Sequence, residues 1–343
     1  MSAFFETLLK LDQAAIADLP DRPPTVFVHA MPNLMPGAAA GKLDFVQLLT
    51  GLLAGCGFRP VLVAAGDLID KAIAAHRGHL HIVLGDQPRY APNVFSVVPA
   101  YLNGYWYFDE LGSRNNSSIR LRRFHARGMD DTYASQVFER LREKFVHANR
   151  SKYAQETDTN VKIEPGAVCI FLQNFKDPEF FPNYIPYPDL IRGVIENRGN
   201  RHVYIKPHPL QPAQDMIDIA HLADPKSGIS IVSHGIHDLL ANADITVTQT
   251  SAVGFESFLH KTPVLLAGQT DFHHNAVTAL QPSEIGAAMQ DALDRHFDYE
   301  KYLVWFLKQN LFEPRKKRHT AARCASLLRQ KGIPVPLEMT RGS

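Results

Sequence analysis

The hydrophobic residues of this chain gather in short runs that alternate with stretches of helical spacing. Residues 25–30 form a compact apolar run, typical of a strand buried on both faces of a parallel sheet. Residues 43–54 place apolar side chains three or four positions apart, which predicts a helix. Because strand and helix alternate at this pitch, the first part of the chain predicts a doubly wound α/β domain. Its other predicted elements are helices at 4–18 and 130–153, strands at 60–65 and 82–85, and a Pro/Gly-rich loop at 31–41.

The same alternation resumes after a polar stretch. Residues 154–166 are rich in polar side chains and end in Pro165-Gly166, so they predict a linker. The length of 343 residues is large for one core. We therefore expect two α/β domains, at 1–153 and 167–343, with a cleft between them and the last helices able to cross back. The second domain is predicted to hold strands at 167–172, 203–205, 229–232, 245–247 and 264–267, and helices at 188–198, 236–241, 252–260, 282–294, 302–311 and 320–330.

Composition narrows the class of protein. A formal net charge of +1 argues against a general nucleic-acid binder, which would carry a marked basic excess. Cys56, Cys169 and Cys324 stand far apart, so we expect no structural zinc cluster and a reducing compartment. The first residues lack the basic and apolar regions of a secretory signal, and no run approaches the roughly 18 apolar residues that span a bilayer. We expect a cytoplasmic protein.

Candidate chemistry in the second domain lies where predicted strands end. One strand is followed by Lys206-Pro207-His208-Pro209, and the strand at 245–247 by Thr248-Gln249-Thr250-Ser251. Ser251 is a candidate N-cap for the helix at 252–260. The amides and dipole of that helix start would favour a phosphate, so the stretch suits the phosphates of a nucleotide. An ordinary strand exit and a capped helix explain the same residues equally well.

In the first domain, residues 97–118 combine five aromatic rings with acids, amides and hydroxyls. One interpretation is a long functional loop, since such loops carry sites. The alternative is an aromatic hairpin at an edge of the domain. The polar residues of interest in this segment are Asp109, Glu110, Asn115, Asn116 and Ser117.

Three further clusters could bind a ligand. The run Arg120, Arg122, Arg123, His125 and Arg127 is either a solvated surface or a contact for an anionic substrate. Arg315-Lys316-Lys317-Arg318 is either a solvated charge run or a peripheral contact with anionic lipid. His273 and His274 are adjacent, so their side chains diverge on regular backbone, and no third ligand follows. We therefore predict no metal there.

Several of these motifs, in this order and spacing, resemble the bacterial capsule polysaccharide biosynthesis glycosyltransferases, which include the β-Kdo transferases. They are Lys206-Pro207-His208-Pro209, the stretch from Thr250 through Gly254 to Glu256, the stretch from Lys261 to Gly268, Leu172-Gln173, and residues 104–118. The resemblance implies a GT-B fold of two Rossmann-like domains, with the donor bound mainly by the second. It also implies retaining transfer from a nucleotide sugar, CMP-Kdo in the characterised Kdo branch, without a metal or other cofactor. The chain agrees in having no Asp-x-Asp motif.

The resemblance and the residue types together assign roles. Lys206 and His208 are expected to neutralise the leaving phosphate, unless they form loop contacts or point away. Glu256 is expected to take ribose hydroxyls, unless it is simply solvated. The candidate residues are Asp109, Glu110 and His208 for catalysis; Lys206, His208, Pro209, Thr250, Ser251, Gly254, Glu256 and Gln173 for the donor; and Asn115, Asn116 and Ser117 for the acceptor. Helix capping, turn chemistry and strand-end hydrogen bonds are the structural alternatives.

One position departs from the family pattern. Relatives usually carry an acid directly before the Gly of a Gly-Tyr element, whereas here Asn103 precedes Gly104. Asp109 and Glu110 are then the nearest carboxylates, with Asp86 another at a strand end. The expected partners are a nucleotide-sugar donor and a glycan or lipid-linked glycan acceptor, and no nucleic acid. The rival hypotheses are a UDP- or GDP-sugar transferase, an epimerase of the same fold, and a non-catalytic subunit of a capsule assembly complex.

Overall fold

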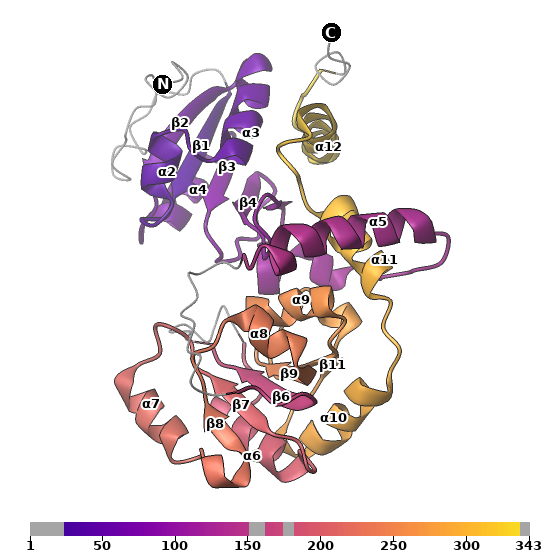
Figure 1. The fold of residues 1–343 in the computed structure, drawn as a ribbon. Helices are drawn as coiled ribbons and strands as arrows, with labels where there is room; N and C mark the ends of the chain where they lie inside the picture. The colour runs from indigo at the N-terminus through magenta and orange to yellow at the C-terminus, as the bar shows by residue number, and fades with distance from the viewer. Residues whose placement is uncertain (1–23, 151–161, 174–181, 337–343) are drawn as a thin grey trace. The chain divides into compact units, whose positions relative to one another are not determined.

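The computed structural model describes residues 24–150, 162–173 and 182–336. Within these ranges the chain forms two compact units. Unit 1 contains residues 24–118 and 311–336, and unit 2 contains the described residues between 119 and 310. Each unit has its own sheet (Figure 1). No helix in the described ranges is long and apolar enough to cross a membrane.

The sheet of unit 1 has the strand order β2-β1-β3-β4-β5, in which only β5 is antiparallel to its neighbour. This is the flavodoxin-like doubly wound order, whose switch point lies between β1 and β3. The elements are β1 (Thr25–Ala30), α2 (Met35–Ala39), α3 (Asp44–Gly55), β2 (Arg59–Ala64), α4 (Ile69–Ala75), β3 (Leu80–Leu84), β4 (Val94–Pro99), β5 (Trp106–Asp109), the 3-10 turns η1 (Arg114–Asn116) and η2 (Ser118–Leu121, which continues into unit 2), and α12 (Lys317–Gln330).

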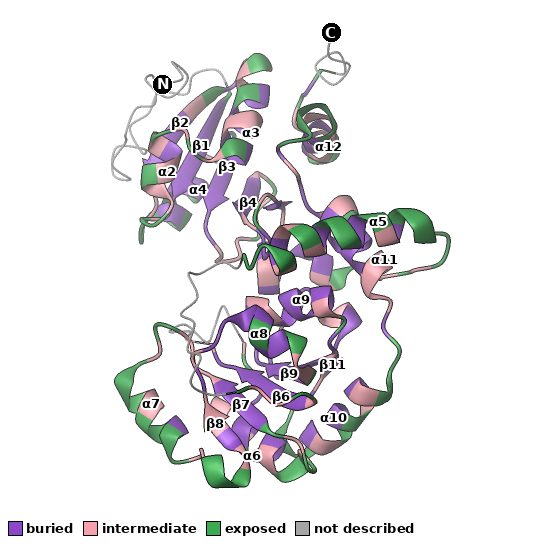
Figure 2. Cartoon of the chain, in the orientation of Figure 1, coloured by how far each residue is buried: buried purple, intermediate pink, exposed green. Residues whose placement is uncertain are grey.

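Helices cover both faces of this sheet because consecutive strand residues point to opposite sides. Val26 and Val28 of β1 pack in one core with Phe45 of α3 and Leu328 of α12. Phe27, between them in sequence, packs on the other face. A strand buried on both faces needs apolar side chains at nearly every position, which explains the continuous runs in the sequence. Figure 2 shows most strand residues of both units as buried.

Unit 2 has a six-stranded sheet, all parallel, in the order β11-β10-β9-β6-β7-β8. Read from β8, this is the Rossmann order 3-2-1-4-5-6, so the switch point lies between β6 and β9. The elements are α5 (Asp131–Arg142), the π-helix η3 (Glu143–His147), β6 (Ala167–Phe171), α6 (Tyr187–Asn197), β7 (Val203–Lys206), α7 (Ala213–Ala220), η4 (Pro225–Ser227), β8 (Ile229–Ile231), α8 (Ile236–Ala241), β9 (Ala243–Thr248), α9 (Ala252–Ser257), η5 (Phe258–His260), β10 (Val264–Leu266), η6 (His273–Asn275), β11 (Val277–Thr278), η7 (Pro282–Glu284), α10 (Ile285–Asp294), α11 (Tyr299–Val304) and the π-helix η8 (Trp305–Asn310).

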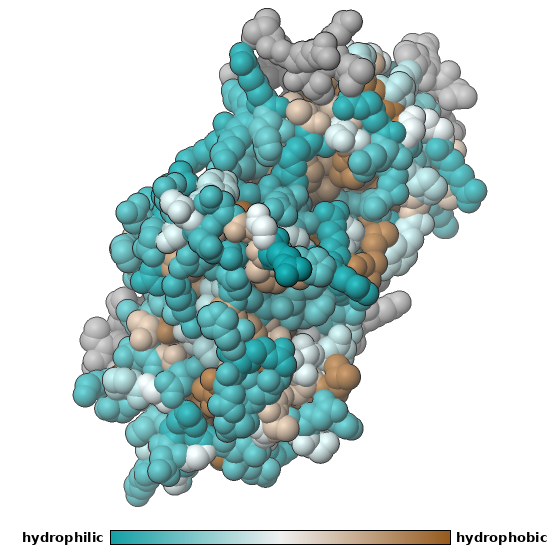
Figure 3. Space-filling view, turned by 90° about the vertical axis from the view of Figure 1, so that its right-hand side faces the viewer, coloured by the Kyte–Doolittle hydropathy of each residue, from teal (hydrophilic) through white to brown (hydrophobic). Residues whose placement is uncertain are grey.

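The core of unit 2 is divided by the sheet in the same way. Val168 and Ile170 of β6 pack with Ile191 of α6 on one face. Cys169 lies between them and packs with Leu239 of α8 on the other. Hydrophilic residues predominate on the face of the molecule in Figure 3, and hydrophobic residues show there only as smaller areas. The described residues therefore put their continuous apolar runs inside two layered α/β cores.

The predicted α/β class with two parallel-sheet domains is confirmed. Residues 97–118 contain the hairpin of β4 and β5, followed by a loop. The expected loop at 31–41 was wrong in part, because α2 begins there at Met35 with Pro36 in its first turn, where a missing N–H costs nothing. The predicted helix at 4–18 and most of the linker lie outside the described residues. The domain boundaries stay a prediction, and α5 packs within unit 2.

Candidate functional site

The carboxyl ends of four neighbouring strands in unit 2 emerge at one edge of the sheet. The sheet register makes their last residues level: Phe171, Lys206, Thr248 and Leu266. Two positions beyond these lie Gln173, His208, Thr250 and Gly268. We call these four residues the strand-exit row. Gln173 and Thr250 flank the switch point between β6 and β9, the place where open α/β sheets bind ligands.

Two polar atoms of the strand-exit row have no hydrogen-bond partner among the described residues. In the described part of the chain, Gln173 Oε1 and Thr250 Oγ1 are buried without a hydrogen bond. Thr250 is only 3% exposed. A buried polar atom left in this state costs free energy unless water or a ligand satisfies it. The two atoms nearest the switch point are therefore suited to receive a polar ligand.

Gly268 is packed closely against its neighbours in this row. A Cβ placed there would lie 2.7 Å from Thr250 Cγ2 and 3.1 Å from Asn183 Oδ1. Pro182 and Ala267 accept hydrogen bonds from the amides of Gln269 and Tyr184, so the backbone is held on both sides. Only glycine fits this position without displacing its neighbours.

Lys206 and His208 lie at the β7 end of the row. Lys206 Nζ donates to Ser233 O at 3.0 Å, so its ammonium lies over the neighbouring β8 exit rather than away from the sheet edge. His208 Nδ1 accepts from the amide of Leu210 at 3.1 Å, which places the imidazole proton on Nε2 and makes that atom a donor. Pro209 follows as an exposed residue. The predicted loop contacts of these residues are present, and their donor-binding roles stay predictions.

The start of α9 differs from the expected phosphate cradle. Ser251 is the N-cap, as predicted, and its Oγ accepts from Val253 N. The amide of Gly254 donates to Ser251 O. Two first-turn donors are thus already used, so side chains of the strand-exit row are better placed to recognise an anion than these amides. Gly254 itself permits close packing, because a Cβ there would lie 3.2 Å from the Phe272 ring and from Thr248 Cγ2.

Glu256 is buried, not solvated. It is 3% exposed, so the surface alternative considered for it was wrong. A buried carboxylate must be compensated by polar partners, and Glu256 has interactions of this kind. Its ribose-binding role stays a prediction.

A second set of unsatisfied polar atoms includes side chains of the loop that follows β10. Within the described ranges, Arg120 Nε, Thr270 Oγ1, His274 Nδ1, Asn275 Nδ2 and Tyr302 Oη are buried without a hydrogen bond. The loop is otherwise fixed, because His274 Nε2 donates to Arg122 O at 2.8 Å. Burial lowers the pKa of His274 to about 4, so it stays neutral near pH 7. Apart from the Arg120 run and the His273-His274 pair, the sequence did not indicate this group, because satisfaction of hydrogen bonds depends on packing.

In unit 1, Asp109 organises the loop that follows β5. Its Oδ1 accepts from the amides of Leu111 (2.9 Å) and Gly112 (3.2 Å), and its Oδ2 accepts from Ser118 Oγ at 2.6 Å. The amide of Ser118 lies 3.0 Å from both oxygens. A carboxylate with this many local donors is a loop-fixing group. The catalytic role proposed for Asp109 stays a prediction that must compete with this structural one.

The same loop is tied to the switch point of unit 1. Asp86, two residues after β3, accepts from Ser113 Oγ at 3.0 Å and from Arg114 Nη1 at 2.9 Å. Arg114 has a φ of +49°, a strained value for a residue other than glycine. Glu110 forms an ion pair with Lys331, the residue directly after α12. Three proposed acceptor residues of this loop are buried: Asn115, Asn116 and Ser117. The amides of Asn116 and Ser117 donate to Ser113 O and Arg114 O, each at 3.0 Å.

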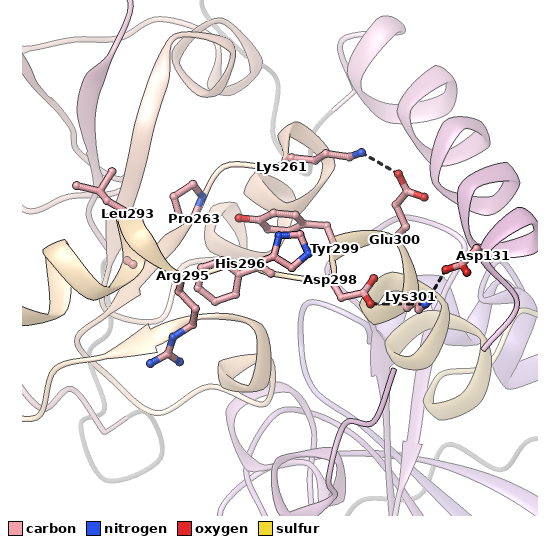
Figure 4. Close-up of a pocket in the computed structure, with 12 residues that line it drawn as sticks. Asp131, Lys261, Pro263, Leu293, Arg295, His296, Asp298, Tyr299, Glu300 and Lys301 are labelled. Atoms are coloured by element: carbon pink, nitrogen blue, oxygen red, sulfur yellow. Dashed lines mark hydrogen bonds and ion pairs between the residues drawn. The ribbon is translucent and has the colours of Figure 1, made fainter. Parts of the chain in front are cut away.

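A cavity of about 610 Å³ lies at the opposite edge of the unit 2 sheet, near Pro263, which precedes β10 (Figure 4). Its cations are already paired. Lys261 Nζ lies 2.7 Å from Glu300 Oε1, and Lys301 Nζ lies 2.6 Å from Asp131 Oδ1. Because these charges satisfy one another, the cavity does not indicate a ligand as the strand-exit row does. No three His, Cys, Asp or Glu side chains in the described ranges are arranged to hold a metal.

The two units thus define a GT-B-like fold, two Rossmann-like α/β units in one chain. No protein-family model and no curated protein matches the sequence. Among solved structures, the chain is similar to "Thermosulfurimonas dismutans KpsC, beta Kdo 2,7 transferase", with a TM-score of 0.53, 13% identity, and coverage of 88% of this chain and 99% of that one. The beta Kdo 2,4 transferase of the same KpsC matches at a TM-score of 0.47, 16% identity, and 81% and 88% coverage. At such identity the likeness supports the predicted resemblance at the level of the fold.

Proposed function

We propose that this protein is a glycosyltransferase that binds a nucleotide-sugar donor at the strand-exit row of unit 2 and transfers the sugar to a glycan or lipid-linked glycan. The observation that carries the proposal is the position of two unsatisfied polar atoms, Gln173 Oε1 and Thr250 Oγ1, on either side of the Rossmann switch point. A nucleotide supplies hydroxyls, ring nitrogens and phosphate oxygens that can satisfy such groups.

The transfer chemistry follows from the charges at the row. Cleavage of the bond between sugar and phosphate leaves a nucleotide with growing negative charge. Two hydrogen-bond donors lie at the β7 exit: the ammonium of Lys206, which is cationic, and the Nε2–H of His208, which is neutral. Both would stabilise the negative charge of the leaving nucleotide in the transition state. We propose that the reaction needs no metal. For the carboxylate that acts on the acceptor side we propose Asp109 or Glu110, with Asp86 as a third candidate.

The donor we propose first is a CMP-linked acidic sugar such as CMP-Kdo. This choice of donor rests on the motif resemblance and on the fold shared with a protein described as a beta Kdo transferase. A UDP- or GDP-sugar transferase or an epimerase would use the same row with another base. The missing acid at Asn103 favours one further candidate, a non-catalytic subunit of a capsule assembly complex.

Thr250→Val tests the binding site without unfolding the protein. The change removes a buried hydroxyl that has no protein partner in the described structure, so the melting temperature should stay the same or rise. Stabilisation by CMP, measured by thermal shift against UDP and GDP, should be weakened or lost.

Thr246→Val, in the strand β9 that leads to Thr250, is the matched control. Thr246 Oγ1 accepts from Ser257 Oγ at 3.0 Å, so this change should lower the melting temperature but leave the nucleotide-induced shift intact. If Thr250→Val binds nucleotides as the wild type does, the proposed site is wrong. Turnover of CMP-Kdo with a lipid-linked acceptor, lost in His208→Ala, separates a transferase from a non-catalytic subunit.

A further inference from the structure

The turn that leads into α12 carries an unbroken set of cations on its surface. Arg315, Lys316, Lys317 and Arg318 are all exposed, and the exposed His319 follows them. Lys316 is near Glu313, at 3.5 Å, in an ion pair that water screens. The whole chain has a formal charge of only +1, so the remaining residues are net negative. The basic turn, defined as residues 315–318, is therefore a local concentration of positive charge.

These cations stand at the unfavourable end of their helix. Helix N-termini carry partial positive charge and favour acids, yet the first turn of α12 has no acidic residue and no side-chain cap. Lys316 is the N-cap and Lys317 the first helical residue. Each cation there opposes the helix dipole, so the dipole does not account for their position. Residues that break a local stability rule in this way are typical of functional surfaces.

The structure holds the basic turn in a fixed position. Glu313 O accepts from Thr320 Oγ1 at 2.6 Å and from Lys316 N at 2.9 Å, which closes the turn from behind. The Arg323 guanidinium lies 4.5 Å from the centre of the Phe312 ring. On its other side α12 packs into the core of unit 1 through Cys324 and Leu328. The charges are thus presented outward on a rigid base.

We propose that the basic turn 315–318 is a peripheral membrane contact that binds a bilayer surface rich in anionic phospholipid. Four consecutive residues occupy about one helical turn, or roughly 6 Å of helix axis, which is short for a linear polyanion. Single-stranded nucleic acid is usually bound by cations interleaved with aromatic side chains, and residues 315–319 contain no Phe, Tyr or Trp. An exposed basic turn instead matches the negative surface of an anionic leaflet. The inference does not depend on the proposed transfer reaction.

Vesicle sedimentation tests the proposal with the full chain. Wild-type protein should bind vesicles of equal parts phosphatidylcholine and phosphatidylglycerol, should bind pure phosphatidylcholine much less, and should be released as salt is raised. Arg315→Glu with Lys317→Glu should weaken the partition by at least about tenfold. Because acids favour a helix N-terminus, this double variant should keep or raise the melting temperature, so lost binding cannot be blamed on unfolding.

The matched control is Lys71→Glu with Arg77→Glu, two exposed cations in or just after α4 of the same unit. It changes the net charge by the same amount and should leave vesicle binding unchanged. Equal loss in both double variants would mean that net charge alone governs binding and would overturn the proposal. Binding of a soluble polyanion such as heparin without binding of anionic vesicles would overturn it as well.

Discussion

Lowering the pH from 7 to 5 should destabilise unit 1, because two buried histidines of its sheet must stay neutral in the folded state. His29 of β1 and His81 of β3 are both fully buried and their rings stack, with His29 Nε2 2.9 Å from His81 Nδ1. His81 Nε2 lies 3.1 Å from His76 O, so it carries the proton. His81 Nδ1 then accepts from His29 Nε2–H. Protonating either ring would add a charge in the core, and a proton on His81 Nδ1 would also break its hydrogen bond with His29.

The size of the effect follows from the two pKa values. Burial, assisted by the charges of His81 and Arg89, lowers the pKa of His29 to about 3. Burial lowers the pKa of His81 to about 4, and the charges of His76 and His79 act in the same direction. In an unfolded chain both would titrate near 6.5. Between these values the unfolded state binds more protons than the folded state. The free energy of unfolding therefore has its full value above pH 6.5 and falls as the pH drops towards 4. At pH 5 the loss is about 2 kcal/mol for each histidine, or about 4 kcal/mol together.

Hydrogen exchange of peptides from β1 and β3 is the suitable assay, because it reports on unit 1 apart from unit 2. The protection free energy, corrected for the intrinsic pH dependence of exchange, should fall by about 4 kcal/mol between pH 7 and pH 5. The variant His29→Leu with His81→Leu removes both titrating groups, and whatever its stability at pH 7, its pH dependence should be much flatter. Equal slopes in the variant and the wild type would refute the assignment.

Three further substitutions test individual residues. Asp109→Asn replaces one acceptor oxygen of the loop-fixing carboxylate and should cost about 2 kcal/mol in urea unfolding, whereas normal stability with lost turnover would instead support a catalytic role. Gly268→Ala puts a Cβ 2.7 Å from Thr250 Cγ2, so it should destabilise unit 2 by about 1–3 kcal/mol and weaken nucleotide binding in the thermal-shift assay. Gly51→Ala in α3 meets nothing within 4 Å and should raise the stability of unit 1 by about 1 kcal/mol; a loss would contradict the packing described for that helix.

Much of the secondary structure could be predicted from the sequence, because its causes are local. The strand at 25–30 and the helix at 236–241 begin and end where their patterns predicted. A strand buried on both faces must be apolar throughout, and a helix must repeat its apolar positions near every 3.6 residues. The Ser251 cap was predictable for the same reason, since its hydrogen bond reaches only to Val253. The two α/β sheets follow from this local alternation.

The sequence indicated several residues of the site but not how they are arranged. Gln173 and Thr250 stand 77 positions apart, and they flank one switch point only because β9 returns to pair with β6. Asp109 was a candidate for chemistry by residue type, while its bonds to the loop ending at Ser118 became visible only in three dimensions.

Tertiary structure also decided which polar atoms lack partners and which elements share a core. The unsatisfied atoms of Thr250 and Gln173 depend on what distant segments bring near them. Packing of α12 into unit 1 likewise depends on contacts with α3, far away in the chain. Hydrophobic periodicity acts over a few residues, so the sequence by itself determined the elements and the fold class. Strand order, hydrogen-bond satisfaction and helix docking arise from contacts across the chain, so only the folded protein determined the site.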